Sequence, residues 1–284
     1  MPVAIVSDTC HYLRRDLVSD NGIHQVSLYV HRQGETLRES EIDDYDDYYT
    51  RLGRESELPT TSQPSIGDFL TVYEPLLDQG DDIVSIHLAG GMSGTVSTAE
   101  QAREQLGERA ERVHVIDSRS ACGGQGLVTL AAAAAARSGA DASAVVDRTR
   151  QAREKLDLWF AIETLEYLRR GGRIGGAQAW LGSALQIKPI LTVEGEITPV
   201  ERVRTSRRAF ERMAALLEEC ARHGNDAWMV QHIQSPQEAG RLAERGKEIF
   251  GTDPINFSEI GPVIGTHVGP GLLGVGGIPS SLLQ

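Results

Sequence analysis

The first half of the chain repeats one pattern: a short apolar run, a small or polar turn, and then a segment with helical spacing of its apolar residues. This repetition constrains the fold most, because it is typical of α/β layering. The expected strands cover residues 3–7, 23–31, 82–88 and 112–117, and the helices residues 12–19, 65–77, 95–106 and 124–137. Strands separated by such helices favour a mostly parallel sheet covered on both faces. Its carboxyl-end loops would form a ligand crevice.

A different pattern in the second half indicates an α+β domain. After a strand at residues 158–162, residues 188–203 alternate apolar and polar side chains around Glu194-Gly195, which predicts a β-hairpin. Helices over residues 206–222 and 236–250 and strands over residues 227–233 and 255–260 follow. We therefore expect an N-terminal α/β domain of residues 1–157 and a C-terminal α+β domain of residues 158–284. A cleft between them is the expected ligand site.

The charge balance argues against nucleic acid and anionic membranes as partners. The chain carries 28 Lys and Arg against 40 Asp and Glu, a net charge of −12, whereas both partners require a basic face. No apolar run approaches the roughly 18 residues of a membrane span. The first residues also lack the basic and apolar regions of a signal peptide, so a cytoplasmic protein is expected. The acidic residues 41–57 are expected to form a solvated amphipathic helix.

Cofactor signatures are missing or fail their structural test. One G-x-G-x-x-G stands at residues 269–274, but only ten residues follow it, too few for the required helix. Neither a Walker A motif nor an H-E-x-x-H motif occurs. The widely spaced Cys10, Cys122 and Cys220 predict neither a disulfide framework nor a zinc site. We therefore expect no metal and no nucleotide cofactor.

The segment Gly91-Met92-Ser93-Gly94-Thr95, between an expected strand and an expected helix, admits three interpretations. Free N–H groups and hydroxyls at a helix start would hold a carboxylate or phosphate. Alternatively, Ser93 only caps the helix. The third interpretation is a nucleophile elbow, with Ser93, Asp117 and His267 in the chain order of an α/β-hydrolase triad. A serine esterase is thus the enzymatic alternative.

Two further segments carry polar groups suited to a ligand. Residues 59–65 (PTTSQPS) place several hydrogen-bonding side chains, Thr61 among them, between two prolines. This is either a rigid binding loop or a plain turn. His267 is the single histidine in a stretch of glycine, proline and aliphatic residues. It is either a packed structural residue or an imidazole beside a bound anion.

Basic residues are concentrated in two places despite the negative net charge. Arg169, Arg170 and Arg173 surround a glycine-rich break, and a second group runs from Arg202 to Arg208. Solvated helix faces account for many arginines. The functional interpretation is contact with phosphate or with an acidic partner, which suits the forked guanidinium.

These motifs, in this order, resemble the DegV family of bacterial lipid-binding proteins. The resemblance covers essentially the whole chain and rests on Ser7-Asp8-Thr9, Thr60-Thr61-Ser62-Gln63-Pro64-Ser65, Met92-Ser93-Gly94-Thr95, Val115-Ile116-Asp117-Ser118, residues 165–174 (LEYLRRGGRI), residues 187–191 (IKPIL) and residues 265–271 (GTHVGPG). It implies a two-domain α/β fold that holds one long-chain fatty acid similar to palmitate. The carboxylate would be bound in the cleft and the acyl chain buried in a tunnel.

The resemblance also implies roles for individual residues. Thr61, Ser93, the Gly94 amide and His267 are the expected carboxylate ligands. Some family members deliver the acid to a separate, ATP-dependent fatty acid kinase that makes acyl phosphate. In that setting Arg173 and Arg202 would contact the kinase or the phosphoryl group. The chain itself is then expected to be a lipid carrier in fatty acid metabolism rather than an enzyme.

Overall fold

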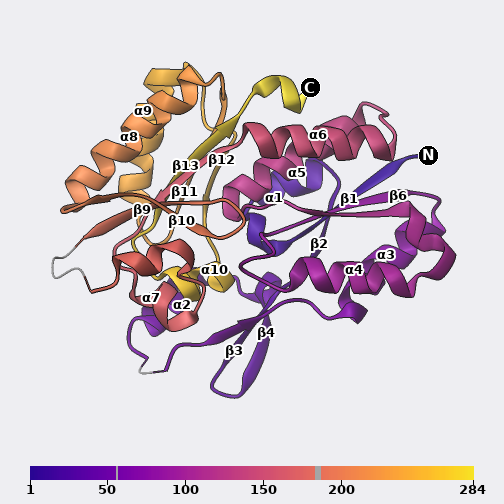
Figure 1. Cartoon of the computed structure of the whole chain (residues 1–284), viewed down its shortest axis with the longest axis horizontal. Coiled ribbons are helices and arrows are strands. Elements are labelled where there is room, and N and C mark those ends of the chain that lie inside the picture. The colour runs from indigo at the N-terminus through magenta and orange to yellow at the C-terminus, as the bar shows by residue number, and fades with distance from the viewer. Residues whose placement is uncertain (56, 183–186) are drawn as a thin grey trace.

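A four-stranded parallel sheet forms the centre of the first half of the molecule, in a computed structural model that describes residues 1–55, 57–182 and 187–284 (Figure 1). Its order is β2-β1-β6-β7. The strands are β1 (Val3–Asp8), β2 (Ile23–Val26), β6 (Asp82–His87) and β7 (Val113–Asp117). The expected parallel α/β sheet is confirmed.

Helix pairs cover both faces of this sheet, as the alternation of side chains along β1 requires. Ala4 and Val6 pack in the cluster below α3 (Ile66–Asp78) and α4 (Thr95–Gln105). Ile5 between them faces the cluster that contains α5 (Cys122–Arg137) and α6 (Ala142–Lys155). Figure 1 shows the two pairs on opposite sides of the sheet. Residues 3–6 of β1 are therefore all apolar, because the strand is covered on both sides.

The prediction of a single strand over residues 23–31 is wrong, because the segment contains two strands of different sheets. β2 ends at Val26, and β3 (Tyr29–Arg32) belongs to a second, antiparallel sheet of order β4-β3-β5, with β4 (Glu35–Arg38) and β5 (Thr60–Ser62). Gln33 and Gly34, at φ 51° and 85°, make the tight turn of the β3–β4 hairpin. The apolar run continues across the break because residues on both sides of it are buried, so periodicity alone did not locate the end of the strand.

A six-stranded mixed sheet organises the second half, in the order β10-β9-β8-β13-β11-β12. The hairpin expected over residues 188–203 is confirmed as antiparallel β9 and β10. β13 was not expected, because glycines dominate its sequence. The six strands are β8 (Asp157–Ala161), β9 (Lys188–Val193), β10 (Ile197–Val203), β11 (Ala227–His232), β12 (Asn256–Glu259) and β13 (Leu273–Ile278).

Helices α8 (Ser206–Arg222) and α9 (Pro236–Phe250) cover one face of the mixed sheet, where they enclose Trp228 and Val230. The short helices are α1 (Arg15–Asp20), α2 (Tyr45–Leu52), α7 (Glu166–Gly171) and α10 (Pro262–Val268), with 3-10 turns η1 (Thr9–His11), η2 (Glu39–Glu41), η3 (Gly107–Arg112), η4 (Gly175–Trp180) and η5 (Ser280–Leu283). No helix of the described ranges is long and apolar enough to cross a membrane.

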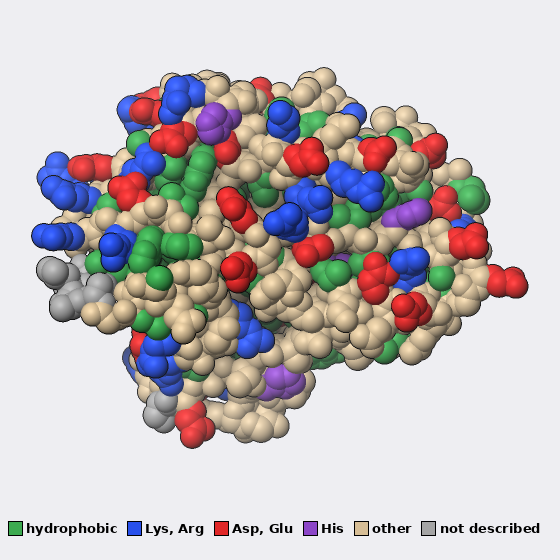
Figure 2. Space-filling model, viewed as in Figure 1, with side chains coloured by type: hydrophobic (Ala, Val, Ile, Leu, Met, Phe, Trp, Pro, Cys, Tyr) green, Lys and Arg blue, Asp and Glu red, His purple; other side chains and the backbone are tan. Residues whose placement is uncertain are grey.

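We keep the domain division at residue 157 as a proposal. All strands of the parallel sheet precede it, and β8, the first strand of the mixed sheet, begins at Asp157. The antiparallel sheet and α2 come from the first half of the chain but pack against α10 of the second half. Acidic and basic side chains lie side by side over much of the surface in Figure 2, so this face presents no uniformly basic area.

Candidate functional site

A small cavity lies where α10 meets β5 and the loop between β6 and α4. We call it the head cavity. Among the described residues that line it, Arg173 is the only Lys or Arg, and there is no Asp or Glu. Its lining consists of Leu28, Thr61, Ser62, Gln63, Leu88, Met92, Ser93, Leu168, Arg173, Val263, Ile264, His267 and Val268. The structure thus brings Thr61, Ser93, Arg173 and His267 to one place.

The His267 ring is buried and has one polar partner. Its Nε2 lies 2.7 Å from the Thr61 hydroxyl oxygen, while Nδ1 is buried and has no hydrogen-bond partner among the described residues. Burial, and to a lesser degree the Arg173 guanidinium, lowers the pKa of His267 to about 4. The ring is therefore neutral at pH 7 and has capacity for one further hydrogen bond.

Ser93 and Gly94 occupy the start of α4. The Ser93 hydroxyl lies 2.8 Å from that of Thr95 and accepts the Thr95 N–H at 3.3 Å. Gly94 is the N-cap residue and supplies no side-chain cap, so the positive end of the helix dipole faces outward beside Ser93. A Cβ at Gly94 would approach Gln63 Nε2 to 3.0 Å. Glycine therefore lets the polar loop after β5 lie against the helix start.

A second small cavity is almost entirely apolar. We call it the tail cavity. Among its described lining residues Gln231 has the only amide side chain, and its hydrogen bonds are made: Oε1 accepts the Gly123 N–H at 2.5 Å, and Nε2 donates to the Tyr12 carbonyl at 3.1 Å. The lining consists of Met92, Ala121, Cys122, Leu158, Phe160, Val193, Ile197, Met229, Gln231, Ile260, Ile264, Val268, Leu272 and Gly274.

The two cavities adjoin, because Met92, Ile264 and Val268 line both of them. The wall between them is therefore only one layer of side chains. A polar chamber next to an apolar one suits an amphiphilic ligand with a small anionic group and a long apolar part.

Arg202 lies apart from the head cavity. It stands on β10, where its guanidinium stacks 5.3 Å from the centre of the Trp180 ring. Arg173 is exposed, and its Nη1 donates to the Gly171 carbonyl at 2.9 Å. The two arginines are thus in different settings, and of the two only Arg173 lines the head cavity.

The esterase alternative lacks its triad. The Asp117 carboxylate accepts the backbone N–H groups of Arg119 at 2.7 Å and Gly90 at 3.2 Å. Within the described residues, nothing hydrogen-bonds to His267 Nδ1, where a triad needs its carboxylate. Ser93 has Thr95 as its partner, so no base activates it.

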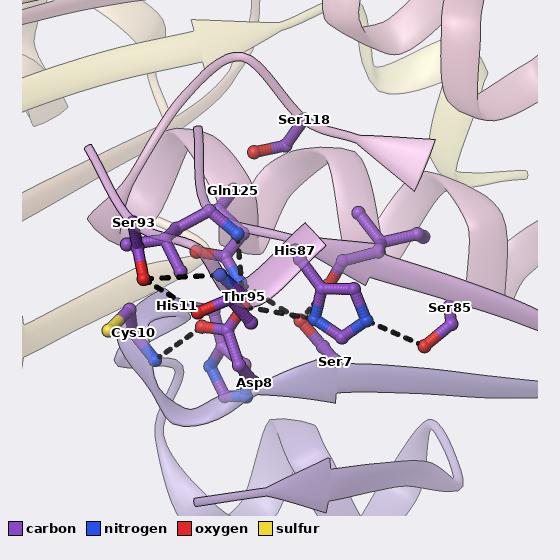
Figure 3. A network of polar contacts seen from close by, with 12 residues as sticks. Ser7, Asp8, Cys10, His11, Ser85, His87, Ser93, Thr95, Ser118 and Gln125 are labelled. Atoms are coloured by element: carbon purple, nitrogen blue, oxygen red, sulfur yellow. Dashed lines mark hydrogen bonds and ion pairs between the residues drawn. The ribbon is translucent and has the colours of Figure 1, made fainter. Parts of the chain in front are cut away.

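A buried carboxylate, Asp8, fixes the loop that carries Ser93. Asp8 Oδ2 accepts the Leu88 N–H at 3.0 Å and lies 3.1 Å from His87 Nδ1. Its Oδ1 accepts the Cys10 N–H at 3.0 Å. Figure 3 shows Asp8 between the His87 ring and the Cys10 backbone. Burial alone would raise the pKa of Asp8, but hydrogen bonds from His87, Gln125 and Leu88 lower it below its ordinary value.

Glu39 fixes α10 in a similar way. Its carboxylate is 3% exposed and accepts hydrogen bonds from the Thr9 hydroxyl at 2.5 Å, the Tyr12 hydroxyl at 2.7 Å and the Val263 N–H at 2.8 Å. The Tyr12 oxygen in turn accepts the Ile264 N–H at 3.1 Å. Burial raises the pKa of Glu39 above its ordinary value, and the three hydrogen bonds oppose that rise. Sequence reasoning missed Glu39, whose local context is only that of an acidic surface stretch.

Comparisons with known proteins show the family and the fold of this chain. Residues 2–280 match the family model described as an uncharacterised protein of the DegV family. A DegV domain-containing protein of Clostridium acetobutylicum is 39% identical over 279 residues, 97% of either chain. A DegV family protein from Thermus thermophilus, described as fatty acid binding, has a TM-score of 0.87 at 32% identity, over 98% of this chain and 100% of that one. DegV of Bacillus subtilis, described as a fatty acid binding protein, has a TM-score of 0.87 at 33% identity, over 98% and 99%.

Proposed function

This chain belongs to the DegV family, and we propose on that premise that it binds one long-chain fatty acid such as palmitate, as a carrier rather than an enzyme. The carboxylate occupies the head cavity and the acyl chain extends into the tail cavity. The observation that carries this proposal is that a polar chamber, with no acidic residue among its described lining residues, adjoins an apolar one and shares three side chains with it.

The head cavity supplies what a partly buried carboxylate needs. Without partners, such a group would be costly to bury. The Ser93 hydroxyl, the Gly94 N–H and the bonded pair of Thr61 and His267 are the proposed hydrogen-bond donors. Arg173 adds a cation at the cavity wall. Because the neutral His267 ring and the Thr61 hydroxyl carry one proton each, and one of the two is used in the bond between them, the pair can donate the other proton to the carboxylate.

The tail cavity supplies the affinity. At about 0.8 kcal/mol for each buried CH₂ group, a sixteen-carbon chain gains on the order of 10 kcal/mol before ordering costs. Among the described lining residues, the Gln231 amide is already bonded to protein groups, and the Cys122 thiol, a weak donor, loses little beside a hydrocarbon. Affinity thus comes from the tail and orientation from the head.

Lipid analysis tests the proposal directly. The purified protein is extracted under denaturing conditions, and the lipid that co-purified with it is identified by mass spectrometry. We expect a long-chain fatty acid in about equimolar amount. If none is found and none binds on addition to stripped protein, the proposal is wrong.

A pair of threonine variants tests the site. Thr61→Val removes a hydroxyl of the head cavity and should weaken palmitate binding by about tenfold, the effect of losing one hydrogen bond to a charged group. Thr60→Val is the matched control, because Thr60 neighbours Thr61 on β5 but does not line the head cavity. Equal palmitate affinities of the two variants would show that the Thr61 hydroxyl does not bind the carboxylate. Ser93→Ala should likewise weaken binding, with no ester hydrolysis by either protein.

The family resemblance extends the proposal to a cytoplasmic kinase partner that receives the bound acid. We propose Arg202 as a contact with such a partner, because it is exposed on β10 and does not line the head cavity. With the cognate kinase, Arg202→Ala should reduce acyl phosphate formation while palmitate affinity stays within about twofold of wild type. Equal losses in both measurements would contradict a partner contact and indicate a structural role for Arg202.

A further inference from the structure

Three side chains separate the head and tail cavities. Among the described residues only Met92, Ile264 and Val268 line both cavities. Ile264 and Val268 stand on α10, whereas Met92 comes from the loop between β6 and α4. Given the proposed function, on which this inference rests, an acyl chain that joins the two cavities would pass between these side chains, and we call that passage the neck.

On the α10 side of the neck, the two side chains have little rotational freedom. Ile264 and Val268 are β-branched, and in a helix such side chains have one strongly preferred rotamer. A Cβ on Gly265, which lies between them in sequence, would clash with the ring and hydroxyl of Tyr49. The helix is therefore packed as closely against α2 as a glycine allows.

Hydrogen bonds to the first half of the chain hold α10 in that position. Its N-terminal N–H groups are bound by Glu39 and Tyr12. In its middle, the Thr266 hydroxyl lies 2.5 Å from the Tyr48 hydroxyl. Tyr49 donates to the Ile260 carbonyl just before the helix, at 2.6 Å. Movement of α10 away from the neck would break these bonds together.

The Met92 side is different. Methionine is unbranched and has three rotatable side-chain bonds, and this one is only partly buried. Its backbone is held, because Met92 N–H donates to the Ala89 carbonyl at 2.9 Å and a Cβ on Gly91 would clash with the Gly195 carbonyl in the β9–β10 turn. Rotation of the Met92 side chain is thus a small motion that would widen the neck.

We propose that the Met92 side chain is the movable side of this neck, and that it sets both the rate at which acyl chains enter and leave and the tolerance for branches beside the carboxylate. Because the neck borders the head cavity, the carbons that lie in it are those nearest the carboxylate. A methyl branch on the α-carbon would meet Met92 and the two stiff side chains, whereas a branch at the far end of the chain would lie in the tail cavity.

Stopped-flow kinetics with cis-parinaric acid, an unbranched fluorescent fatty acid, test the proposal. Met92→Ala should raise the association and dissociation rate constants together, each by about tenfold, while Kd changes by less than about threefold. Met92→Ile, with a branched and stiffer side chain, should lower both rate constants. Met229→Ala is the matched control, since Met229 lines the tail cavity alone. It should raise the dissociation rate constant and leave association unchanged.

Competition between palmitate and its α-methyl derivative gives a second measurement. The wild type should prefer palmitate, and Met92→Ala should reduce that preference while Met229→Ala preserves it. If Met92→Ala alters only the dissociation rate constant, as Met229→Ala does, or leaves the preference for palmitate intact, the proposed role of Met92 is refuted. The proposed binding of a fatty acid would not be affected by that result. A wild-type protein that binds no fatty acid would refute the proposed function and the neck with it.

Discussion

Acid should destabilise this protein well above the pH at which carboxylates titrate, and His11 is the clearest cause. Its ring is 1% exposed, and Nδ1 accepts the Leu13 N–H at 2.9 Å. Burial lowers the pKa of His11 from 6.5 to about 4, although the nearby Asp8 opposes the shift. Between these two pKa values the unfolded chain binds a proton that the folded protein does not, so stability rises with pH across that window and is lost on acidification.

The size of the effect follows from the shift. A folded pKa of about 4 against 6.5 unfolded corresponds to about 3 kcal/mol per histidine when the whole window is crossed. Most of it, about 2 kcal/mol, is lost between pH 7 and pH 4.5. The pKa of His267 is lowered to about 4 in the same way. Acidification across the whole window of both histidines would therefore remove a large share of the free energy of unfolding, which is roughly 5–15 kcal/mol for a typical protein.

His11→Asn isolates the contribution of one ring. The asparagine carbonyl can accept the N–H two residues on, as in an Asx turn, so the bond to Leu13 can be kept without a titrating group. Guanidinium unfolding of ligand-free protein, followed by circular dichroism from pH 7 to pH 4.5, should show the variant losing about 2 kcal/mol less than wild type. His24→Asn, at an exposed position on β2, is the control and should follow the wild type. Parallel curves for wild type and His11→Asn would refute the reasoning.

Three further outcomes are expected. Gly171→Ala would bring a methyl group against His267 Nδ1, so palmitate affinity measured by titration should fall by about tenfold or more while the circular dichroism spectrum is unchanged. Glu39→Ala leaves buried donors such as the Val263 N–H unsatisfied and should destabilise the fold by about 3 kcal/mol in guanidinium unfolding, whereas Glu39→Gln, which keeps an acceptor, should cost less. A carboxylate beside His267 raises the pKa of that ring. Binding should therefore take up protons and strengthen as pH falls towards 4, which calorimetry in buffers of different ionisation enthalpy detects, and release of protons would contradict it.

The elements that sequence located best are those whose periodicity is set by one buried face. Helices α8 and α9 begin and end where the pattern predicted, because each lays one apolar side on the mixed sheet. β13 could not be predicted from sequence, because glycine has a low strand propensity. The glycines are required there by close packing: a Cβ on Gly276 would clash with the Asp157 carbonyl, and one on Gly277 would lie 2.7 Å from the Asn225 carbonyl. Close approach of neighbouring strands is a property of the assembled sheet, which local sequence does not encode.

The site was predictable where a residue type is unusual in its context. A lone histidine among glycines and a polar loop between prolines drew attention to His267 and Thr61, and the structure places their side chains 2.7 Å apart. Their roles in binding remain predictions. Glu39 and Met92 gave no such signal, because each acts through residues distant in sequence: Glu39 through Val263, and Met92 through the two stiff side chains that it faces across the neck.

The molecule does contain a serine, a histidine and an aspartate in hydrogen-bonded series, but in the wrong place for an esterase. Ser85 Oγ lies 2.7 Å from His87 Nε2, and His87 Nδ1 lies 3.1 Å from Asp8 Oδ2. All three residues are 0% exposed, and the Tyr73 hydroxyl donates to Ser85 at 2.7 Å. A nucleophile must reach the acyl carbon of its substrate, and the fully buried Ser85 hydroxyl cannot do so.

Ser93, which does line a cavity, has Thr95 and not a histidine as its hydrogen-bond partner among the described residues. Access and activation are thus separated in the described part of the chain: the Ser93 hydroxyl lines the head cavity, whereas the histidine that is bonded to both a serine and an aspartate is buried. The buried series has a different consequence, since Asp8 binds the backbone N–H groups that follow β1 and β6. It therefore ties the end of β6, whose following loop contributes Leu88, Met92 and Ser93 to the head cavity, to the end of β1. This arrangement favours the proposed carrier over an esterase.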